Sequence, residues 1–341
     1  MPPWPHPAVA AFFDEQSRSQ KLKLPYTLCK ITRYFLPLQK VSKQHISHMA
    51  QFINPFTDWG FKHIFGRDIS KDLLIDFLNS LFAGKHHICD LTFNNTEQQP
   101  ETRNERMVVF DIYCTDEQGK NFIVEMQNRS QPYFIDRAIY YAARAIVKQG
   151  EKGDWDYKLV PVYTVCFMNF EKFFSNGKGG ICETDNNPNE RLFRIDMVLS
   201  EENTKQCLTD KVHFTFLQLP AFEKDEQQCQ TDFERWIYIL NHMETFNRMP
   251  FLAQSAVFKK LAEISDISTL SKEEHEKYDE SIKNYRDTMA AFKETRAEGQ
   301  AEAKREIARN LLKDAIPYAT IAAWTGLTEE EIAQLNAECD A

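Results

Sequence analysis

Residues 107–128 read MVVFDIYCTDEQGKNFIVEMQN. The segment contains two runs rich in β-branched and aromatic residues, and between them lies a turn that contains Gly119. This pattern is typical of two strands joined as a hairpin. Each run carries one carboxylate, Asp111 in the first and Glu125 in the second. We therefore expect the two carboxylates to approach each other across adjacent strands.

Side chains alternate between the two faces of a strand, so the hairpin also predicts which residues share a face. The expected neighbours of the two carboxylates are Val109 and Tyr113 around Asp111, and Ile123 and Gln127 around Glu125. The expected opposite, apolar faces consist of Val108, Phe110, Ile112 and Cys114 in the first strand and Phe122, Val124 and Met126 in the second.

Carboxylates inside apolar strands require compensation, because burying a lone negative charge is costly unless a metal ion or a basic group lies beside it. Two hard oxygen ligands at close range suit Mg²⁺ or Mn²⁺, with waters and a substrate phosphate completing the coordination. Such an ion activates water and stabilises negative charge on a phosphodiester. The alternative interpretation is an amphipathic hairpin whose polar face meets solvent.

The flanking segments predict an order of helix, three strands, helix and strand. One predicted helix has an apolar face formed by Leu73, Leu74, Phe77, Leu78 and Leu81. Helices are predicted over residues 58–65, 68–84 and 131–150. Strands besides the hairpin are predicted over residues 86–95, 159–170, 191–199 and 212–222, and the second of these is apolar enough to be fully buried.

Three motifs together resemble the Rpn family of recombination-promoting nucleases, often described as PD-(D/E)xK nuclease family transposases. The motifs are VVFDIYCTDEQGKNFIVEMQNR, the RAIYYAAR that follows it, and the NPFTDWGFKHIFG that precedes it. The resemblance covers residues 49–225 and extends to the segment TGLTEEEI near the end of the chain. It implies an α/β fold with a restriction-endonuclease-like α-β-β-β-α-β core, a mixed sheet flanked by helices. It also implies Mg²⁺-dependent cleavage of DNA, with roles for Asp111, Glu125 and Gln127.

Gln127 departs from the wider superfamily pattern, in which the residue two positions after the acid is usually lysine. An amide orients water or binds phosphate but brings no charge. Lys62 on the first helix and Arg106 before the first hairpin strand are candidates for the missing cation. Asp58 is a candidate third metal ligand, and an equal alternative is that it caps the first helix.

The predicted helix after the hairpin carries three basic residues on one face. Arg137, Arg144 and Lys148 are spaced i, i+7 and i+11. They are candidates for gripping DNA phosphates, and the alternative is an ordinary solvated face. We expect Tyr140 and Tyr141 on the same helix to belong to the core.

The chain divides into four regions by composition: residues 1–48, 49–225, 226–284 and 285–341. Residues 49–225 form the nuclease-like domain and residues 226–284 a helical region. Residues 1–48 are either translated upstream sequence, with Met49 the true start, or a basic arm for nucleic acid, because Arg18 to Lys43 contain no acid.

The last region begins with a charged, helix-forming segment interrupted by Gly299 and ends as a predicted helix-turn-helix. Gly326 is expected at the turn, and Thr328 is expected to cap the last helix. That helix begins with three consecutive acids, which disfavours direct reading of DNA. Two interpretations remain open for the apolar residues of this helix-turn-helix: they form a homo-oligomer contact, or they form the core of a small helical hairpin. These residues are Ile316, Ile321, Trp324, Ile332 and Leu335.

Composition excludes several classes of protein. A net charge of −9 argues against a surface coated in basic residues, although a local basic groove remains possible. None of the eight cysteines form a CxxC pair, which excludes a zinc ribbon, and their scatter suits a reduced cytoplasmic protein without a membrane span.

The sequence therefore predicts a metal-dependent DNA endonuclease, linked to recombination or mobile elements by resemblance. The alternative is a non-catalytic scaffold that retains the fold and binds DNA or protein. Strand-transfer chemistry of a true transposase finds little support, because it usually rests on a different acidic triad.

Overall fold

The computed structural model describes residues 50–98, 107–150, 153–171, 192–253 and 255–339. These residues form two compact units, residues 50–294 and residues 295–339, each of which we describe by itself. Two features of the sequence analysis lie outside the described residues: the segment 1–48 and Arg106.

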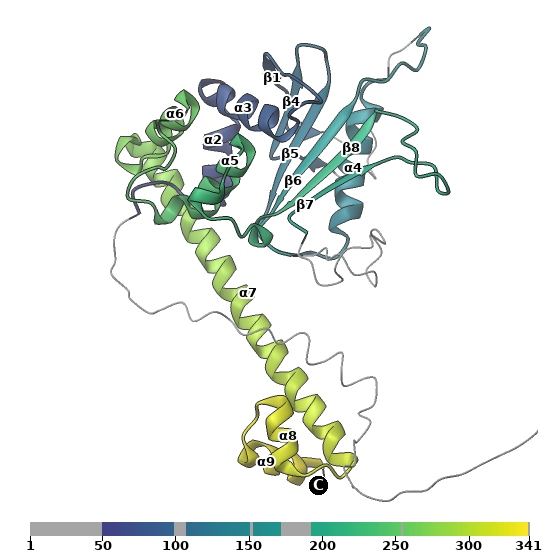
Figure 1. The fold of residues 1–341 in the computed structure, drawn as a ribbon, viewed down its shortest axis with the longest axis vertical. Coiled ribbons are helices and arrows are strands. Elements are labelled where there is room, and N and C mark those ends of the chain that lie inside the picture. The colour runs from purple at the N-terminus through teal and green to yellow at the C-terminus, as the bar shows by residue number, and fades with distance from the viewer. Residues whose placement is uncertain (1–49, 99–106, 151–152, 172–191, 254, 340–341) are drawn as a thin grey trace, which may run out of the picture. The chain divides into compact units, whose positions relative to one another are not determined.

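The first unit is built on a mixed sheet of six strands in the order β1-β4-β5-β6-β8-β7 (Figure 1). The central pairs β5–β6 and β6–β8 are parallel, and the outer pairs β1–β4, β4–β5 and β7–β8 are antiparallel. The strand bounds are β1 Leu91–Phe93, β4 Ile112–Asp116, β5 Asn121–Gln127, β6 Val162–Met168, β7 Arg194–Val198 and β8 Val212–Gln218. A separate two-stranded ribbon consists of β2 Glu97–Gln98 and β3 Val108–Val109.

Helices cover both faces of this sheet (Figure 1). α4 lies on one face, where it connects the parallel strands β5 and β6, and α2, α3, α5 and α6 pack on the other. The α-helices of this unit are α2 Asp58–Phe65, α3 Lys71–Leu81, α4 Phe134–Val147, α5 Asp232–His242, α6 Ala256–Ser265 and the first part of α7 Lys272–Lys313. Short 3₁₀ helices are η2 Asp68–Ser70, η3 Leu219–Ala221, η4 Glu226–Gln228, η5 Met243–Thr245 and η6 Ile267–Thr269.

The alternation of apolar residues in the central strands explains the two layers. In β6, Tyr163, Val165 and Phe167 point to the face of α2 and α3, whereas Val162 and Cys166 point to α4. All seven residues of β6 are buried, which confirms the predicted buried strand. The predicted face of α3 is also confirmed, since all five of its residues are at most 2% exposed: Leu73, Leu74, Phe77, Leu78 and Leu81. An α/β fold with a mixed sheet flanked by helices results, as predicted.

The first strand is shorter than predicted. Of residues 86–95, only Leu91–Phe93 are a strand. The side chain of Asn79 on α3 holds the main chain of Ile88 through two hydrogen bonds, from Ile88 N to Oδ1 (2.7 Å) and from Nδ2 to Ile88 O (2.9 Å). Because these side-chain bonds replace a strand partner, the chain joins the sheet only at Leu91.

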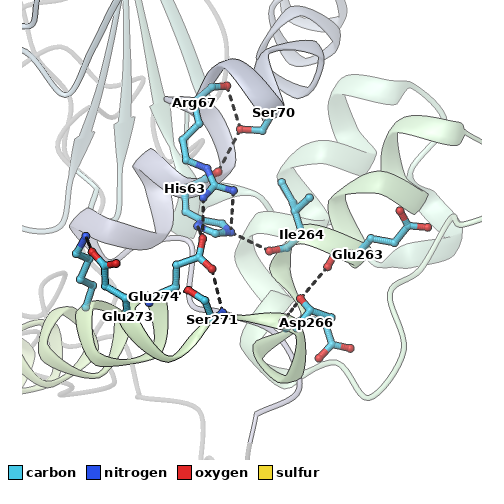
Figure 2. Close-up of polar contacts among 11 residues, drawn as sticks. His63, Arg67, Ser70, Glu263, Ile264, Asp266, Ser271, Glu273 and Glu274 are labelled. Carbon is cyan, nitrogen blue, oxygen red and sulfur yellow. Dashed lines mark hydrogen bonds and ion pairs between the residues drawn. The ribbon is translucent and has the colours of Figure 1, made fainter.

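Polar contacts tie α2 to α6 and to the first turns of α7 (Figure 2). Nε2 of His63 lies 2.9 Å from the carbonyl oxygen of Ile264 at the end of α6. The guanidinium of Arg67 pairs with Glu274 of α7 (Nη1···Oε1 3.0 Å). The Trp59 ring lies against the His63 ring, with 4.2 Å between centroids and the planes tilted by 31°. These contacts hold α2 in place, and α2 carries two of the candidate site residues.

His63 makes the stability of this unit depend on pH. Burial lowers the pKa of His63 from 6.5, and the Arg67 guanidinium lowers it further. The neutral ring is therefore favoured in the folded state, so its contribution is complete above pH 6.5 and is lost as pH falls through the lowered value. We expect the contribution of His63 to the free energy of unfolding to fall between pH 7.5 and pH 5.5.

The variant His63→Gln removes this titration, so its loss of stability over the same interval should be smaller than that of the wild type. Urea unfolding at the two pH values measures the difference, and the exposed His87→Gln serves as control. An equal loss in wild type and His63→Gln would contradict this role of the buried ring.

The second unit comprises the last turns of α7 with α8 Tyr318–Thr325 and α9 Glu329–Cys339. α7 continues through Gly299, so the predicted interruption there is wrong. A lone glycine costs a long helix only about 1 kcal/mol, which the flanking helix-forming residues offset.

The predicted turn and cap near the end of the chain are confirmed. Gly326 ends α8 with φ +70°, which glycine adopts without strain. The amide of Glu331 donates to Oγ1 of Thr328 (3.2 Å), and the amide of Thr328 donates to Oε2 of Glu331 (2.8 Å), a reciprocal cap of α9.

The apolar residues of this small unit are divided between core and surface. Ile321, Ile332 and Leu335 are buried in one cluster, and Ile316 packs against it. Trp324 is 42% exposed. The hairpin-core interpretation therefore describes four of the five residues.

Within the described residues, no helix is both long enough and apolar enough to cross a bilayer.

Candidate active site

The predicted strand over residues 107–114 is broken at Asp111. Its first part, β3, pairs with β2 outside the main sheet, and its second part, β4, pairs with β5. Phe110 leaves the β4–β5 ladder, because its amide donates to the carbonyl oxygen of Thr96 (3.0 Å). Asp111 therefore lies at a bend between two strands and not inside one.

At this bend the two carboxylates take over hydrogen bonds that the backbone ladder no longer makes. The amide of Asp111 donates to Oε1 of Glu125 (3.1 Å), and the amide of Met126 donates to Oδ2 of Asp111 (2.8 Å). Each carboxylate is thus held by the main chain beside the other. The structure brings Asp111 and Glu125 together at the end of β5 where the two strands separate.

The bend also corrects part of the face assignment. Ile112 and Cys114 pack toward α2 and α3, whereas Val108 and Phe110 pack toward α4 together with Tyr113. The predicted shared face of Val108, Phe110, Ile112 and Cys114 is therefore wrong, because the irregular residue at the bend shifts the alternation.

The face assignment in β5 is confirmed. Ile123 packs toward α4, and Phe122 and Val124 pack toward the opposite layer. Glu125 shares the parity of Ile123, so it lies on the α4 side of the sheet.

Burial raises the pKa of both carboxylates. Glu125 is 8% exposed, and its pKa lies well above the ordinary value, first because of burial and second because of the charge on Asp111. Burial also raises the pKa of Asp111, against the hydrogen bond from Met126. Two negative charges repel each other here with little water to screen them, and a divalent cation relieves that repulsion.

The remaining carboxylate oxygens fit a hard cation. Among the described residues, Oδ1 of Asp111 and Oε2 of Glu125 accept no hydrogen bond. They offer two oxygen ligands of the kind that Mg²⁺ and Mn²⁺ prefer, with water and phosphate as the others. The described part of the chain contains no cluster of three or more His, Cys, Asp or Glu that could hold a metal. Asp58 as a third ligand stays a prediction.

Lys62 and Asp58 lie one helical turn apart on α2 and form an ion pair (Nζ···Oδ1 2.7 Å). Both are exposed, Lys62 by 42% and Asp58 by 71% of the side chain. Both charges act on Asp111, since Lys62 lowers the pKa of Asp111 and Asp58 raises it. The helix-cap interpretation of Asp58 is wrong: Thr57 is the N-cap, and its Oγ1 accepts from the amide of Gly60 (2.9 Å).

Gln127 ends β5 on the α4 side, two positions after Glu125. Arg137 of α4 donates through one guanidinium nitrogen to Oε1 of Gln127 and through the other to Oε1 of Gln131 (2.9 Å). The structure therefore places a positive charge against the position where the wider superfamily has lysine. The positive charge of Arg137 lowers the pKa of both Glu125 and Asp111.

The predicted basic face of α4 does not form a continuous exposed stripe. Arg144 is only 9% exposed, whereas Lys148 is exposed at the end of the helix. Tyr141 packs in the core as predicted, but Tyr140 is 42% exposed, which corrects the expectation for that residue.

A hollow of about 430 Å³ borders the site, between the start of α2, the end of β5 and α7. Its lining includes Asp58, Asn128, Lys277 and Asn284. Asn128 is fixed there, since its Nδ2 donates to the carbonyl oxygen of Phe56 (2.7 Å). No local pattern in the sequence indicates a site role for these α7 residues or for Asn128, because their place beside the hairpin depends on contacts between distant segments.

Two regions of the chain match known families. Residues 55–295 match the family described as PD-(D/E)XK nuclease family transposase. Residues 301–337 match the Rpn/YhgA-like nuclease family, C-terminal HTH domain. No curated protein and no solved structure matches the chain. The first match contains the hairpin, α2 and α4, and the second contains α8 and most of α9.

Proposed function

Because the chain belongs to the PD-(D/E)XK nuclease family transposases, we propose that it is a metal-dependent DNA endonuclease that hydrolyses phosphodiester bonds. The observation that carries this proposal is the interlocked pair of Asp111 and Glu125. Both carboxylates have raised pKa values and one oxygen left for a ligand, which supports an ion between them.

In this proposal each residue at the bend has a separate task. Asp111 and Glu125 hold Mg²⁺ or Mn²⁺, which when bound supplies a Lewis acid and a water of lowered pKa. Gln127 donates a hydrogen bond that orients water or a phosphate oxygen. Lys62 adds positive charge at the edge of the site, and Arg106 remains a second candidate for that task.

DNA is the proposed partner, engaged by the nuclease domain over residues 49–225. Arg137, Arg144 and Lys148 remain candidates for phosphate contacts, with Arg144 the weakest because it is buried. The proposed helical regions are residues 226–284 and 285–341. For the second of these regions we favour a contact in a homo-oligomer over the reading of DNA bases, because α9 begins with three acids that repel phosphate. A cytoplasmic location and a link to recombination or mobile elements complete the proposal.

Cleavage of supercoiled plasmid by the full-length protein tests this function. We expect nicking or linearisation with Mg²⁺ or Mn²⁺, none with EDTA, and none from folded Asp111→Ala or Glu125→Ala. Equal behaviour of wild type and variants would favour the non-catalytic scaffold. A scaffold should also bind DNA equally well with and without the two carboxylates, which a gel-shift assay in Ca²⁺ measures.

A further inference from the structure

The proposed active site contains an amide at the position where a lysine is usual, so its positive charge must come from elsewhere. Two cations in the described residues influence both carboxylates, Lys62 from α2 and Arg137 from α4. Lys62 acts more strongly than Arg137 on Asp111, and Arg137 acts more strongly than Lys62 on Glu125. The surroundings of the two side chains differ enough to separate their tasks.

Arg137 is held in a fixed position. Its guanidinium lies over the ring of Phe134 (5.6 Å to the centroid) and over that of Tyr141 (5.9 Å). Gln131 accepts one of its N–H groups (2.9 Å). Stacking and a planar fork of donors restrict an arginine far more than a single ion pair restricts a lysine. The charge beside Gln127 is therefore preorganised.

Lys62 lacks this support. Its side chain is 42% exposed, and its ammonium pairs with Asp58, which is still more exposed. An exposed pair of opposite charges is screened by water and presents little net charge to its surroundings. Lys62 is thus the less rigidly held of the two positive charges, although it is the stronger of the two at Asp111.

The contact between Arg137 and Gln127 also determines how the amide is used. A guanidinium has only donors, so it must take the carbonyl oxygen of Gln127. The NH₂ group of Gln127 is then left to donate. A glutamine with its oxygen occupied in this way presents donors only, as a lysine does.

We propose that Arg137 is a positioning residue that acts with Gln127 as one unit in place of the usual lysine. In this unit Gln127 supplies the directed hydrogen bond and Arg137 supplies the charge and fixes the amide. The inference rests on the proposed nuclease function, and it assigns to Arg137 the positive charge that cleavage needs.

Four full-length proteins test the unit by plasmid cleavage in Mg²⁺: wild type, Arg137→Ala, Gln127→Lys and the double variant. Loss of an outer partner typically costs about 10- to 100-fold in rate, and we expect a fall of this size in kcat for Arg137→Ala with little change in KM. Gln127→Lys alone should also be impaired, because it sets a like charge against Arg137.

The double variant should be at least about tenfold faster than Arg137→Ala, because a lysine at position 127 then supplies both the donor and the charge. A purely structural role of Arg137 predicts the reverse, with the two losses adding. Lys62→Ala is the matched control, and its kcat should fall less than that of Arg137→Ala.

Three outcomes would overturn the inference. These are a double variant no faster than Arg137→Ala, an effect of Arg137→Ala confined to KM as expected for a phosphate contact, and a larger loss from Lys62→Ala. Absence of metal-dependent cleavage by the wild type would instead count against the proposed function.

Calorimetric titration with Mn²⁺ gives a readout that does not depend on cleavage. Removing a positive charge that acts on both carboxylates should strengthen the binding of a divalent cation by about three- to tenfold, because the like charges of the guanidinium and the cation repel each other. Arg137→Ala should therefore bind Mn²⁺ more tightly than wild type. Weaker or unchanged binding would show that the guanidinium does not act on the pair.

Discussion

Replacing Glu125 by glutamine will stabilise the metal-free protein and, at the same time, reduce Mg²⁺-dependent cleavage by about 100- to 1,000-fold. The two effects have one cause. The carboxylate that holds a cation in the working site is, without that cation, a buried negative charge beside a second one. Glutamine keeps the size of the side chain and an oxygen that accepts from the amide of Asp111.

The size and pH dependence of the gain follow from the direction of the pKa shift. The raised pKa of Glu125 means that the folded state binds its proton more tightly than the unfolded state does. This contribution is present at low pH and is lost as pH rises through the raised value. Above that pH the Gln variant should be more stable than wild type by about 1–3 kcal/mol, the typical cost of an uncompensated buried polar group.

Thermal unfolding in EDTA at pH 7.5 and at pH 5 measures this difference. Glu117→Gln is the matched control, because Glu117 is an exposed carboxylate in the turn of the same hairpin. Its pKa is lowered by its own backbone amide and by that of Asp90, so its replacement should not stabilise the protein. A Glu125→Gln variant less stable than wild type at pH 7.5 would show that the buried charge is already compensated by the protein.

Gly60→Ala should cause the largest loss of stability among small substitutions near the site. A β-carbon at this position would overlap the carbonyl oxygen of Asn54 and lie 2.6 Å from Oγ1 of Thr57. Thr57 caps α2 through the amide of Gly60 itself, so relief of the overlap breaks the cap. We expect a loss of about 2–4 kcal/mol, from overpacking together with the lost cap.

The matched control is Gly299→Ala, the same substitution in another helix. A β-carbon there meets nothing within 4 Å, so alanine should stabilise α7 by about 0.5–1 kcal/mol through its higher helix propensity. Circular dichroism during thermal unfolding compares the two variants with wild type. Equal melting temperatures for Gly60→Ala and wild type would contradict the close packing at the start of α2.

Local patterns in the sequence were sufficient for much of the fold. The helical spacing of Leu73, Leu74 and Phe77 predicted the buried face of α3, and the apolar run after Pro161 predicted the central strand β6. Turn chemistry predicted the hairpin around Gly119. These features depend on neighbours within a few residues, which a single sequence displays directly.

The geometry of the candidate site was less accessible, because it depends on contacts between distant segments. The bend at Asp111 arises when β3 pairs with β2 and Phe110 bonds to Thr96, which no alternation of residues indicates. Likewise, the spacing of Arg137 and Arg144 predicted a shared face, but only packing shows that Arg144 is buried and that Arg137 contacts Gln127.

Calorimetric titration of Mn²⁺ into the full-length protein, its Asp111→Asn variant and its Glu125→Gln variant tests the central claim most directly. The claim is that these two carboxylates form one divalent metal site, and it does not depend on the preferred DNA sequence. We predict that wild type binds Mn²⁺ and that each variant binds at least about tenfold more weakly, as expected when one of two carboxylate ligands is lost. Equal Mn²⁺ affinity in wild type and both variants, with all three folded, would contradict the claim.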